Sequence, residues 1–94
     1  MQAVDSRDAF EEFTRDRSPH LFRLAMMLSG WNEAVARDLL QVALERACAR
    51  RRFLFRDGTT PEPYVRRVLV NAAIDWRRAV RHRREESLEG PTPT

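Results

Sequence analysis

Helical spacing of apolar residues is the feature that most limits what this chain can fold into. Between residues 33 and 52, apolar side chains cover well over half of a helix circumference at about 100° per residue. No segment shows the sustained alternation of apolar and polar residues that a half-buried strand requires. A helix with this pattern lies at the centre of a bundle, so the sequence predicts an all-α fold. The apolar positions are Val35, Ala36, Leu39, Leu40, Val42, Ala43, Leu44 and Ala47.

A second helix is predicted before this central one. Asp5 or Ser6 can cap its start, and Gly30 suits the left-handed position that follows a helix end. Ser18 and Pro19 form a cap residue and a first-turn proline in mid-segment, so the helix either restarts there or continues through a kink. The expected architecture is a compact bundle of three main helices, or four if Pro19 breaks the first.

A polar loop and a third long helix complete the predicted bundle. Asn32 can cap the central helix, and Asp57 with Gly58 predicts a tight turn in the loop of residues 53–63. In the last helix, the apolar residues occupy about a third of the circumference and place Trp76 toward the core. These residues are Val65, Leu69, Ala72, Trp76, Ala79 and Val80.

Composition excludes several classes of function. The 94 residues suit one domain, and neither a long apolar run nor an apolar N-terminus is present, so we expect a cytoplasmic protein without membrane insertion. The sole cysteine, Cys48, is predicted to be a buried structural thiol. His20 and His82 lack metal-ligand spacing, and the sequence predicts no metal and no cofactor. Catalytic pairs and phosphate-binding loops are missing as well, so an enzyme is not expected.

Charge is divided unevenly along the chain. Residues 1–45 hold five arginines and eight acids, whereas residues 46–84 hold twelve arginines and three acids. The last ten residues add three acids, and the net charge is +3. The second half therefore suits a polyanionic partner. Every one of the 17 basic residues is arginine, which favours bidentate phosphate contacts and is also what a GC-rich genome encodes.

Two polar faces stand out on the predicted helices. On the central helix, Asp38, Gln41 and Glu45 recur at spacings of three and four, a pattern that an ordinary solvated face also shows. On the last helix, the side opposite Trp76 is rich in arginine, and only Asp75 interrupts it. Arginines without interspersed acids are typical of phosphate binding, and the amide of Asn71 suits a base edge. This side carries Arg66, Arg67, Asn71, Arg77, Arg78, Arg81 and Arg84.

Three segments in order carry a family resemblance. The stretch ARDLLQVALERACAR, a short glycine-containing loop, and PEPYVRRVLVNAAIDWRRAVRHRRE together resemble domain 2 of the extracytoplasmic-function bacterial sigma factors, particularly the actinobacterial SigE-like group. The likeness covers about residues 10–85. It implies an all-helical sigma domain 2 over residues 1–86, with residues 87–94 beginning the linker to a second, helix-turn-helix domain that this chain does not include.

The resemblance also implies partners. The central helix would dock on the clamp helices of the β′ subunit of core RNA polymerase, and the loop and last helix would recognise the −10 promoter element and hold its melted non-template strand. An anti-sigma factor is a further partner that such domains have. The implied polymerase-binding residues are Arg37, Asp38, Gln41 and Glu45. The implied DNA-binding residues are Arg56, Asp57, Thr59, Thr60, Tyr64, Arg67, Asn71, Arg77, Arg78 and Arg81.

Individual roles follow from the matching positions. Arg67 and Asn71 would line the approach of a flipped base, whereas the three later arginines would follow the DNA backbone. Tyr64 stands where relatives often have tryptophan, so it either stacks on a base or packs beneath the loop. Pro61 and Pro63 stand where many relatives have an aromatic and small residues, so the preferred base does not carry over.

Two other classes of function fit parts of the pattern. A stand-alone helical regulator would bind intact duplex, although its recognition helix would follow a short turn and not a long loop. A protein-binding helical adaptor would also present exposed charged helices. Affinity for DNA that falls steeply with salt would separate the DNA-binding readings from the adaptor.

Overall fold

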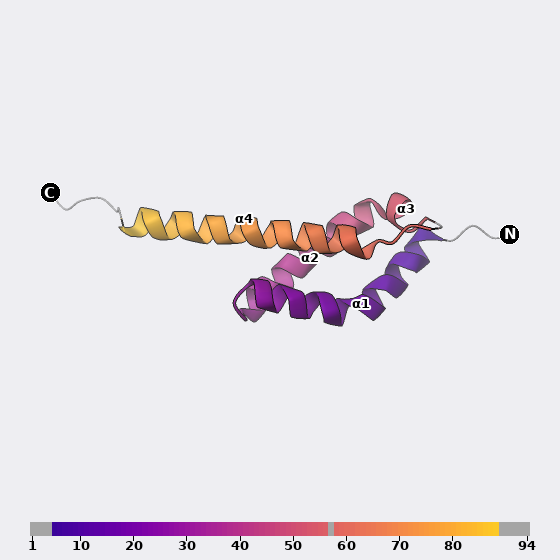
Figure 1. The fold of residues 1–94 in the computed structure, drawn as a ribbon, viewed down its shortest axis with the longest axis horizontal. Helices are drawn as coiled ribbons and strands as arrows, with labels where there is room; N and C mark the ends of the chain where they lie inside the picture. The colour runs from indigo at the N-terminus through magenta and orange to yellow at the C-terminus, as the bar shows by residue number, and fades with distance from the viewer. Residues whose placement is uncertain (1–4, 57, 89–94) are drawn as a thin grey trace.

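The chain folds into four helices. A computed structural model describes residues 5–56 and 58–88 and contains α1 (Ser6–Leu28), α2 (Glu33–Ala49), α3 (Arg51–Leu54) and α4 (Glu62–Leu88) (Figure 1). Over these ranges there is no strand, which confirms the all-α prediction. The central helix ends at Ala49, a few residues earlier than the sequence pattern indicated. None of the helices in this part of the chain combines the length and apolar character needed to cross a membrane.

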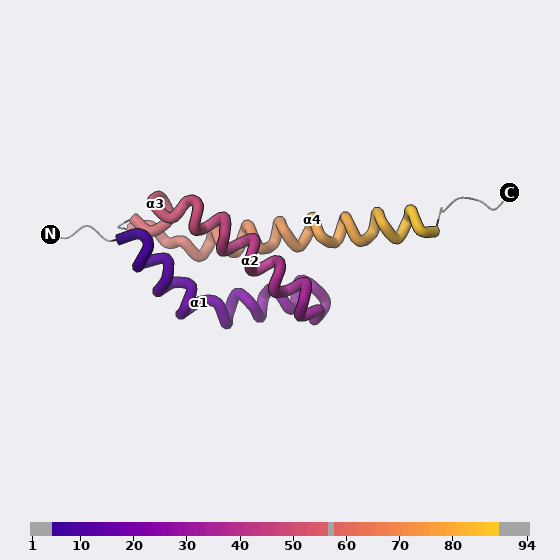
Figure 2. Tube along the Cα trace, turned by 180° about the vertical axis from the view of Figure 1, so that it is seen from behind, coloured from indigo at the N-terminus to yellow at the C-terminus, as the bar shows by residue number. Residues whose placement is uncertain are grey.

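Helix α2 holds the bundle together because it packs against α1, α3 and α4. The ribbon and the tube show α4 running past the turn that joins α1 and α2, so that its C-terminal half projects from the bundle (Figures 1 and 2). The buried residues of α4 are Val65, Val68, Leu69 and Ala73, all in its N-terminal half. The bundle is therefore compact around α1, α2 and the first half of α4, and the rest of α4 is an arm. The last two residues of α4 fall in the segment where the sequence places the linker.

The core contains many small side chains. Ala36, Ala43 and Ala47 line one side of α2 and are 0% exposed, so the neighbouring helices approach its backbone closely. Val65 and Leu69 are buried as predicted, whereas Trp76 is half-buried and packs against the edge of the core. The buried apolar set is Leu21, Ala25, Ala36, Leu39, Ala43, Ala47, Val65, Val68, Leu69 and Ala73.

The predicted apolar stripe of α4 needs one correction. Ala79 is exposed, because it lies in the C-terminal half of α4, beyond the last buried residue of that helix. Val68 and Ala73, which the stripe did not include, are 7% and 1% exposed. The face that packs is thus wider than the one that spacing alone selects, because Val68 and Ala73 extend it on both sides.

Pro19 lies inside a continuous α1, so the helix continues and does not restart. Proline has no N–H to donate to the carbonyl four residues earlier, which explains why α1 changes direction about midway (Figure 2). Asp5 caps the helix as predicted, with its carboxylate accepting from the Arg7 N–H at 2.9 Å. Three main helices, with the short α3, are the outcome.

The turn between α1 and α2 is tightly determined. Gly30 has φ +68° as expected, and Asn32 caps α2 by accepting from the Val35 N–H at 3.2 Å. Ser29 is 5% exposed, and its hydroxyl, which has one proton to donate, lies 3.1 Å from each of the carbonyl oxygens of Met26 and Asn32. Trp31 also has a positive φ of 66° and is 66% exposed, which sequence analysis did not foresee. A bulky residue in this region is strained, so the surrounding hydrogen bonds hold it there.

The close packing of the neighbouring helices on the buried alanines of α2 leads to a prediction about stability. Ala43→Leu is expected to lower the free energy of unfolding by about 1–3 kcal/mol, because added methylene groups have no space at a 0% exposed position. Ala34→Leu, at an exposed position of the same helix, is the matched control and should change it by less than about 0.5 kcal/mol. Thermal unfolding of both variants measures the difference, and equal melting temperatures would contradict this account of the core.

Candidate functional site

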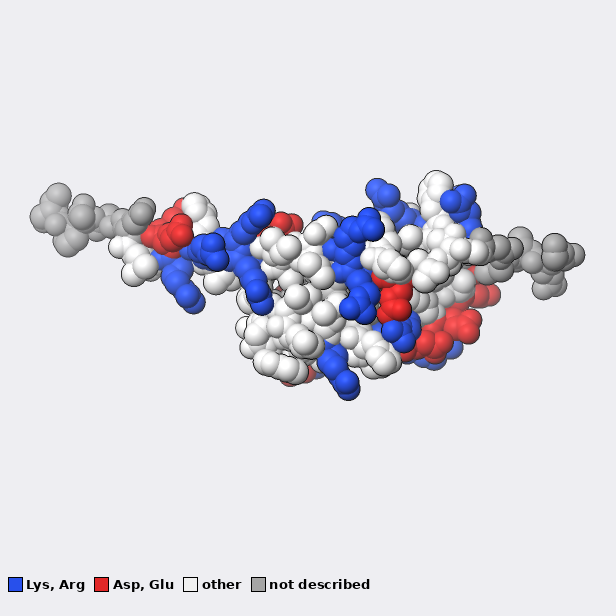
Figure 3. All heavy atoms as spheres, viewed as in Figure 1, with Lys and Arg blue, Asp and Glu red and all other residues white. Residues whose placement is uncertain are grey.

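The arginines of α4 form an exposed basic face. Arg67, Arg78 and Arg81 are exposed, and within the described residues none of them is paired with a carboxylate. Figure 3 shows arginines gathered along α4 and a cluster of acidic residues over α1, with a further acidic group near the C-terminal end of α4. Unpaired guanidinium groups on one helix leave a positive potential that attracts a polyanion. Asn71 is exposed on the same helix, as the DNA-binding prediction requires.

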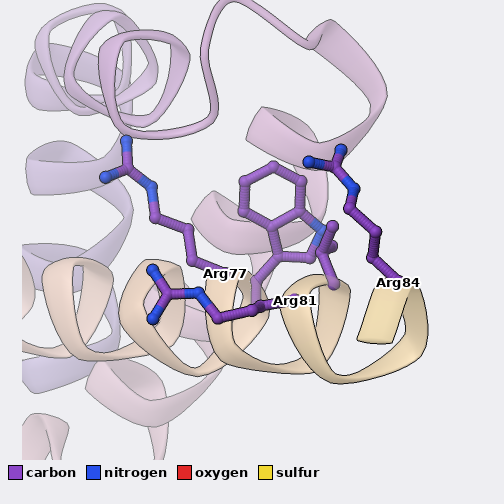
Figure 4. A pocket seen from close by; sticks show the side chains of 5 residues that line it. Arg77, Arg81 and Arg84 are labelled. Atoms are coloured by element: carbon purple, nitrogen blue, oxygen red, sulfur yellow. The ribbon is translucent and has the colours of Figure 1, made fainter. Parts of the chain in front are cut away.

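Arg77 differs from its neighbours. Its Nε and Nη2 groups donate to the carbonyl of Leu28 at 3.1 and 2.7 Å, across 49 residues of sequence. In Figure 4 its side chain reaches away from α4 toward the rest of the bundle. The guanidinium is therefore engaged within the chain, whereas those of Arg78 and Arg81 are not.

A hollow of about 230 Å³ lies along the arm of α4. Trp76 and Val80 supply its apolar side, and Arg77, Arg81 and Arg84 supply its polar side (Figure 4). Arg84 was not among the predicted site residues, and the sequence placed it on the side opposite Trp76, whereas the structure brings both side chains to this hollow. The hollow offers an apolar surface with cationic groups around it.

The loop before α4 contains the predicted turn. The Thr59 N–H donates to the Arg56 carbonyl at 3.0 Å, and Gly58 has φ +78°. Arg56, Thr59 and Thr60 are exposed, and Arg56 lies over the ring of Phe53 at 5.3 Å from its centroid. Asp57 lies outside the described residues. Three of the predicted loop residues thus face solvent at the start of the basic helix.

Tyr64 is half-buried and packs against the core. The guanidinium of Arg50 lies 5.8 Å from its ring centroid, a cation–π contact that sequence spacing did not suggest. This arrangement favours packing beneath the loop over a free stacking surface. Arg67, three residues after Tyr64 and therefore about one helical turn further along α4, is exposed.

An ion pair ties the loop to α1. Arg17 Nε donates to Glu62 Oε1 at 3.0 Å, and Arg17 Nη2 contacts the same oxygen. The side chains are 36% and 26% exposed. Glu62 is the first residue of α4, so the pair fixes where the basic helix begins.

The polar ridge of α2 is exposed as predicted. Arg37, Asp38, Gln41 and Glu45 all face solvent, on the side opposite the buried alanines. Gln41 Nε2 donates to Glu45 Oε1 at 3.0 Å, and Arg37 pairs with Glu33 one turn earlier. Asp38 has no hydrogen bond or ion pair within the part of the chain that the structure describes, so its carboxylate is free for a partner.

Comparison with known proteins identifies the family. The Sigma-70 region 2 family matches residues 13–84, which include α2, the loop and the arginines of α4. The chain belongs to the sigma-70 region 2 family. It is 39% identical over 70 residues to the RNA polymerase sigma-E factor of Streptomyces coelicolor, a match covering 74% of this chain. The aligned part is 38% of that relative's length, and no solved structure matches the chain.

Both faces described above fall inside the sigma-70 region 2 match. The resemblance inferred from the three sequence segments is therefore confirmed at the level of the family. The first part of α1, which precedes residue 13, lies outside the match. Within residues 5–56 and 58–88, no three His, Cys, Asp or Glu side chains gather closely enough to hold a metal ion.

The ion pair between Arg17 and Glu62 makes a second prediction. A double-mutant cycle with Arg17→Gln and Glu62→Gln is expected to give a coupling energy of about 0.5–1 kcal/mol, because the pair is only partly exposed and joins two helices. Urea unfolding of the four proteins measures it. Strictly additive effects would show that the pair does not anchor α4.

Proposed function

We propose that this chain is the part of a bacterial sigma factor that binds core RNA polymerase and that recognises and holds the melted −10 promoter element during initiation. Membership of the sigma-70 region 2 family supports the class of function. The single observation that carries the DNA half of the proposal is the set of unpaired arginines on an arm of α4 that projects from the bundle. The domain makes and breaks no covalent bond in this role.

The α2 ridge is the proposed polymerase contact. Asp38 and Gln41 present a carboxylate and an amide on a helix whose other side is fixed in the core, so little freedom is lost on binding. These groups suit charge-assisted and neutral hydrogen bonds to arginine and polar side chains of the β′ clamp helices. Arg37 and Glu45 flank the contact. An anti-sigma factor that covered this ridge would compete with polymerase.

The loop and α4 are the proposed promoter contact. Thr59 and Thr60 are exposed in the loop, and Arg67 and Asn71 are exposed on the helix that follows. In this proposal the threonines receive a flipped base and the two helix residues line its approach. Arg78 and Arg81 would hold the phosphates of the displaced strand. Opening is then a matter of differential binding, because unstacked bases and their phosphates bind this surface more tightly than paired ones do. Easily unstacked TA steps lower the cost of opening.

The polymerase contact is tested by capture of core RNA polymerase on the immobilised chain. Asp38→Ala combined with Gln41→Ala is expected to weaken association at least about tenfold, equivalent to about 1.4 kcal/mol. Glu11→Ala, which removes an exposed carboxylate from α1, is the matched control and should bind like the unaltered chain. Equal loss in both variants would contradict a specific ridge. Failure of the unaltered chain to capture polymerase would favour the duplex-binding regulator or the adaptor.

The promoter contact is tested with duplex DNA and with forked DNA that carries an unpaired −10 strand. Forked DNA is expected to bind more tightly, and Arg78→Ala should reduce the slope of log affinity against log salt by about 0.7–0.9, the share of one phosphate. Asn71→Ala should act mainly through the sequence of the unpaired strand. Arg23→Ala, an exposed arginine on α1, is the control. Preference for intact duplex would overturn the proposal.

A further inference from the structure

The C-terminus of α1 leaves one carbonyl without a local donor. The last four carbonyls of a helix have no partner within it, and the turn after α1 supplies donors to three of them. Ala25 accepts from the Ser29 N–H at 2.9 Å, Met26 from the Trp31 N–H at 2.7 Å, and Met27 from the Gly30 N–H at 3.4 Å. For Leu28, the only recorded donor among the described residues is the guanidinium of Arg77.

The electrostatics of the same helix end favour this contact. A helix C-terminus carries partial negative charge, which cations in the last turn usually balance. The last turn of α1 contains no basic residue. Arg77 therefore provides from α4 both the missing donor and the missing charge.

The contact also lies beside a strained backbone position, Trp31, whose positive φ is unfavourable for a bulky residue, whereas Gly30 adopts such a φ freely. Gly30 and Trp31, the second and third residues after Leu28, both have positive φ. Such a turn keeps its shape only where surrounding contacts determine it. The hydroxyl of Ser29 fixes it from within, and Arg77 fixes it from the neighbouring helix.

The place of Arg77 along α4 determines what its contact with Leu28 does. Arg77 follows Ala73, the last buried residue of α4, and lies at the base of the projecting arm. Its bonds to Leu28 therefore join α1 to α4 at the point where the core stops supporting α4. Arg77, Arg78 and Arg81 are all exposed, but within the described residues the side chains of Arg78 and Arg81 make no hydrogen bond or ion pair.

We infer that Arg77 is a positioning residue. It caps α1 and thereby fixes the direction of the arm that carries Arg78 and Arg81, in place of the DNA-backbone contact that the sequence assigned to it. The inference rests on the proposed function for what the arm binds, but the capping contact itself does not depend on it. Three successive members of one arginine cluster thus divide into one that sets the geometry and two that bind phosphate.

Thermal unfolding of the 94-residue chain tests the cap. Arg77→Ala is expected to lower Tm by roughly 4–8 °C, the shift that a domain of this size shows when one such contact is lost. Arg77→Lys should restore at least half of that loss, because its ammonium donates to the same carbonyl. Arg78→Ala, the matched control, should change Tm by less than about 2 °C. An unchanged Tm in Arg77→Ala would overturn the inference.

Salt dependence separates positioning from phosphate binding. With a fluorescent single strand of the −10 element, Arg77→Ala is expected to lower affinity by roughly twofold to tenfold, the size of coupling between contacting residues, without changing the salt slope. Arg77→Lys should recover much of that affinity. Arg78→Ala should instead reduce the slope by about 0.7–0.9. A slope reduced equally by Arg77→Ala would show that Arg77 contacts phosphate and would overturn the assignment.

Amide hydrogen exchange distinguishes failure of this inference from failure of the proposed function. Arg77→Ala should accelerate exchange at residues 29–32, and Arg77→Lys should reverse the effect, whether or not the chain binds DNA. Exchange unchanged by Arg77→Ala would overturn the cap. Absence of DNA binding by the unaltered chain, with the exchange effect present, would instead refute the promoter contact and leave the α1 cap established.

Discussion

The close packing of α2 against both α1 and α4 is the constraint on which the other features depend. Alanine at three buried positions of α2 lets the neighbouring helices approach its backbone, so one short helix supports two long ones. Helical periodicity then leaves the opposite side of α2 in solvent, with Asp38 and Gln41 on it. The buried side of α2 and the proposed polymerase ridge therefore follow from the same helical spacing. Shifting that spacing by one residue would disrupt both.

The arm of α4 follows from where that packing ends. Beyond Ala73 no residue of α4 is buried. Past the contacts of Trp76 with the core and of Arg77 with Leu28, the arm relies on its own backbone bonds and on local pairs such as His82 with Glu86. Arg77 and Arg81, and also Arg78 and Arg81, lie one turn apart and repel by a few tenths of a kcal/mol per pair. A phosphate backbone relieves that repulsion. The same feature that weakens the free arm therefore favours its complex with a polyanion.

Apolar spacing and capping residues, which act over a few neighbouring positions, predicted most of the helices and their caps. The features that sequence analysis did not predict depend on contacts between residues far apart in the chain. Apolar spacing located the three long helices, and the caps at Asp5 and Asn32 follow from neighbouring backbone donors. The early end of α2 could not be read from spacing, because no helix-breaking residue marks it. After α2, Phe55 packs edge-on against α1, with its ring centroid 5.9 Å from that of Phe10 and 5.5 Å from that of Phe13. Such pairings are set by the fold.

The same limit explains why identical arginines take different roles. Residue type and helix face placed Arg77 with Arg78, yet only Arg77 lies where a carbonyl of α1 lacks a donor. Together with the pair between Arg17 and Glu62, it attaches α4 to α1 at two separate points. A helix held at two points presents its remaining side chains in a fixed direction. Capture of a melted strand depends on that rigidity, because binding energy lost to ordering the arm would no longer favour open over paired DNA.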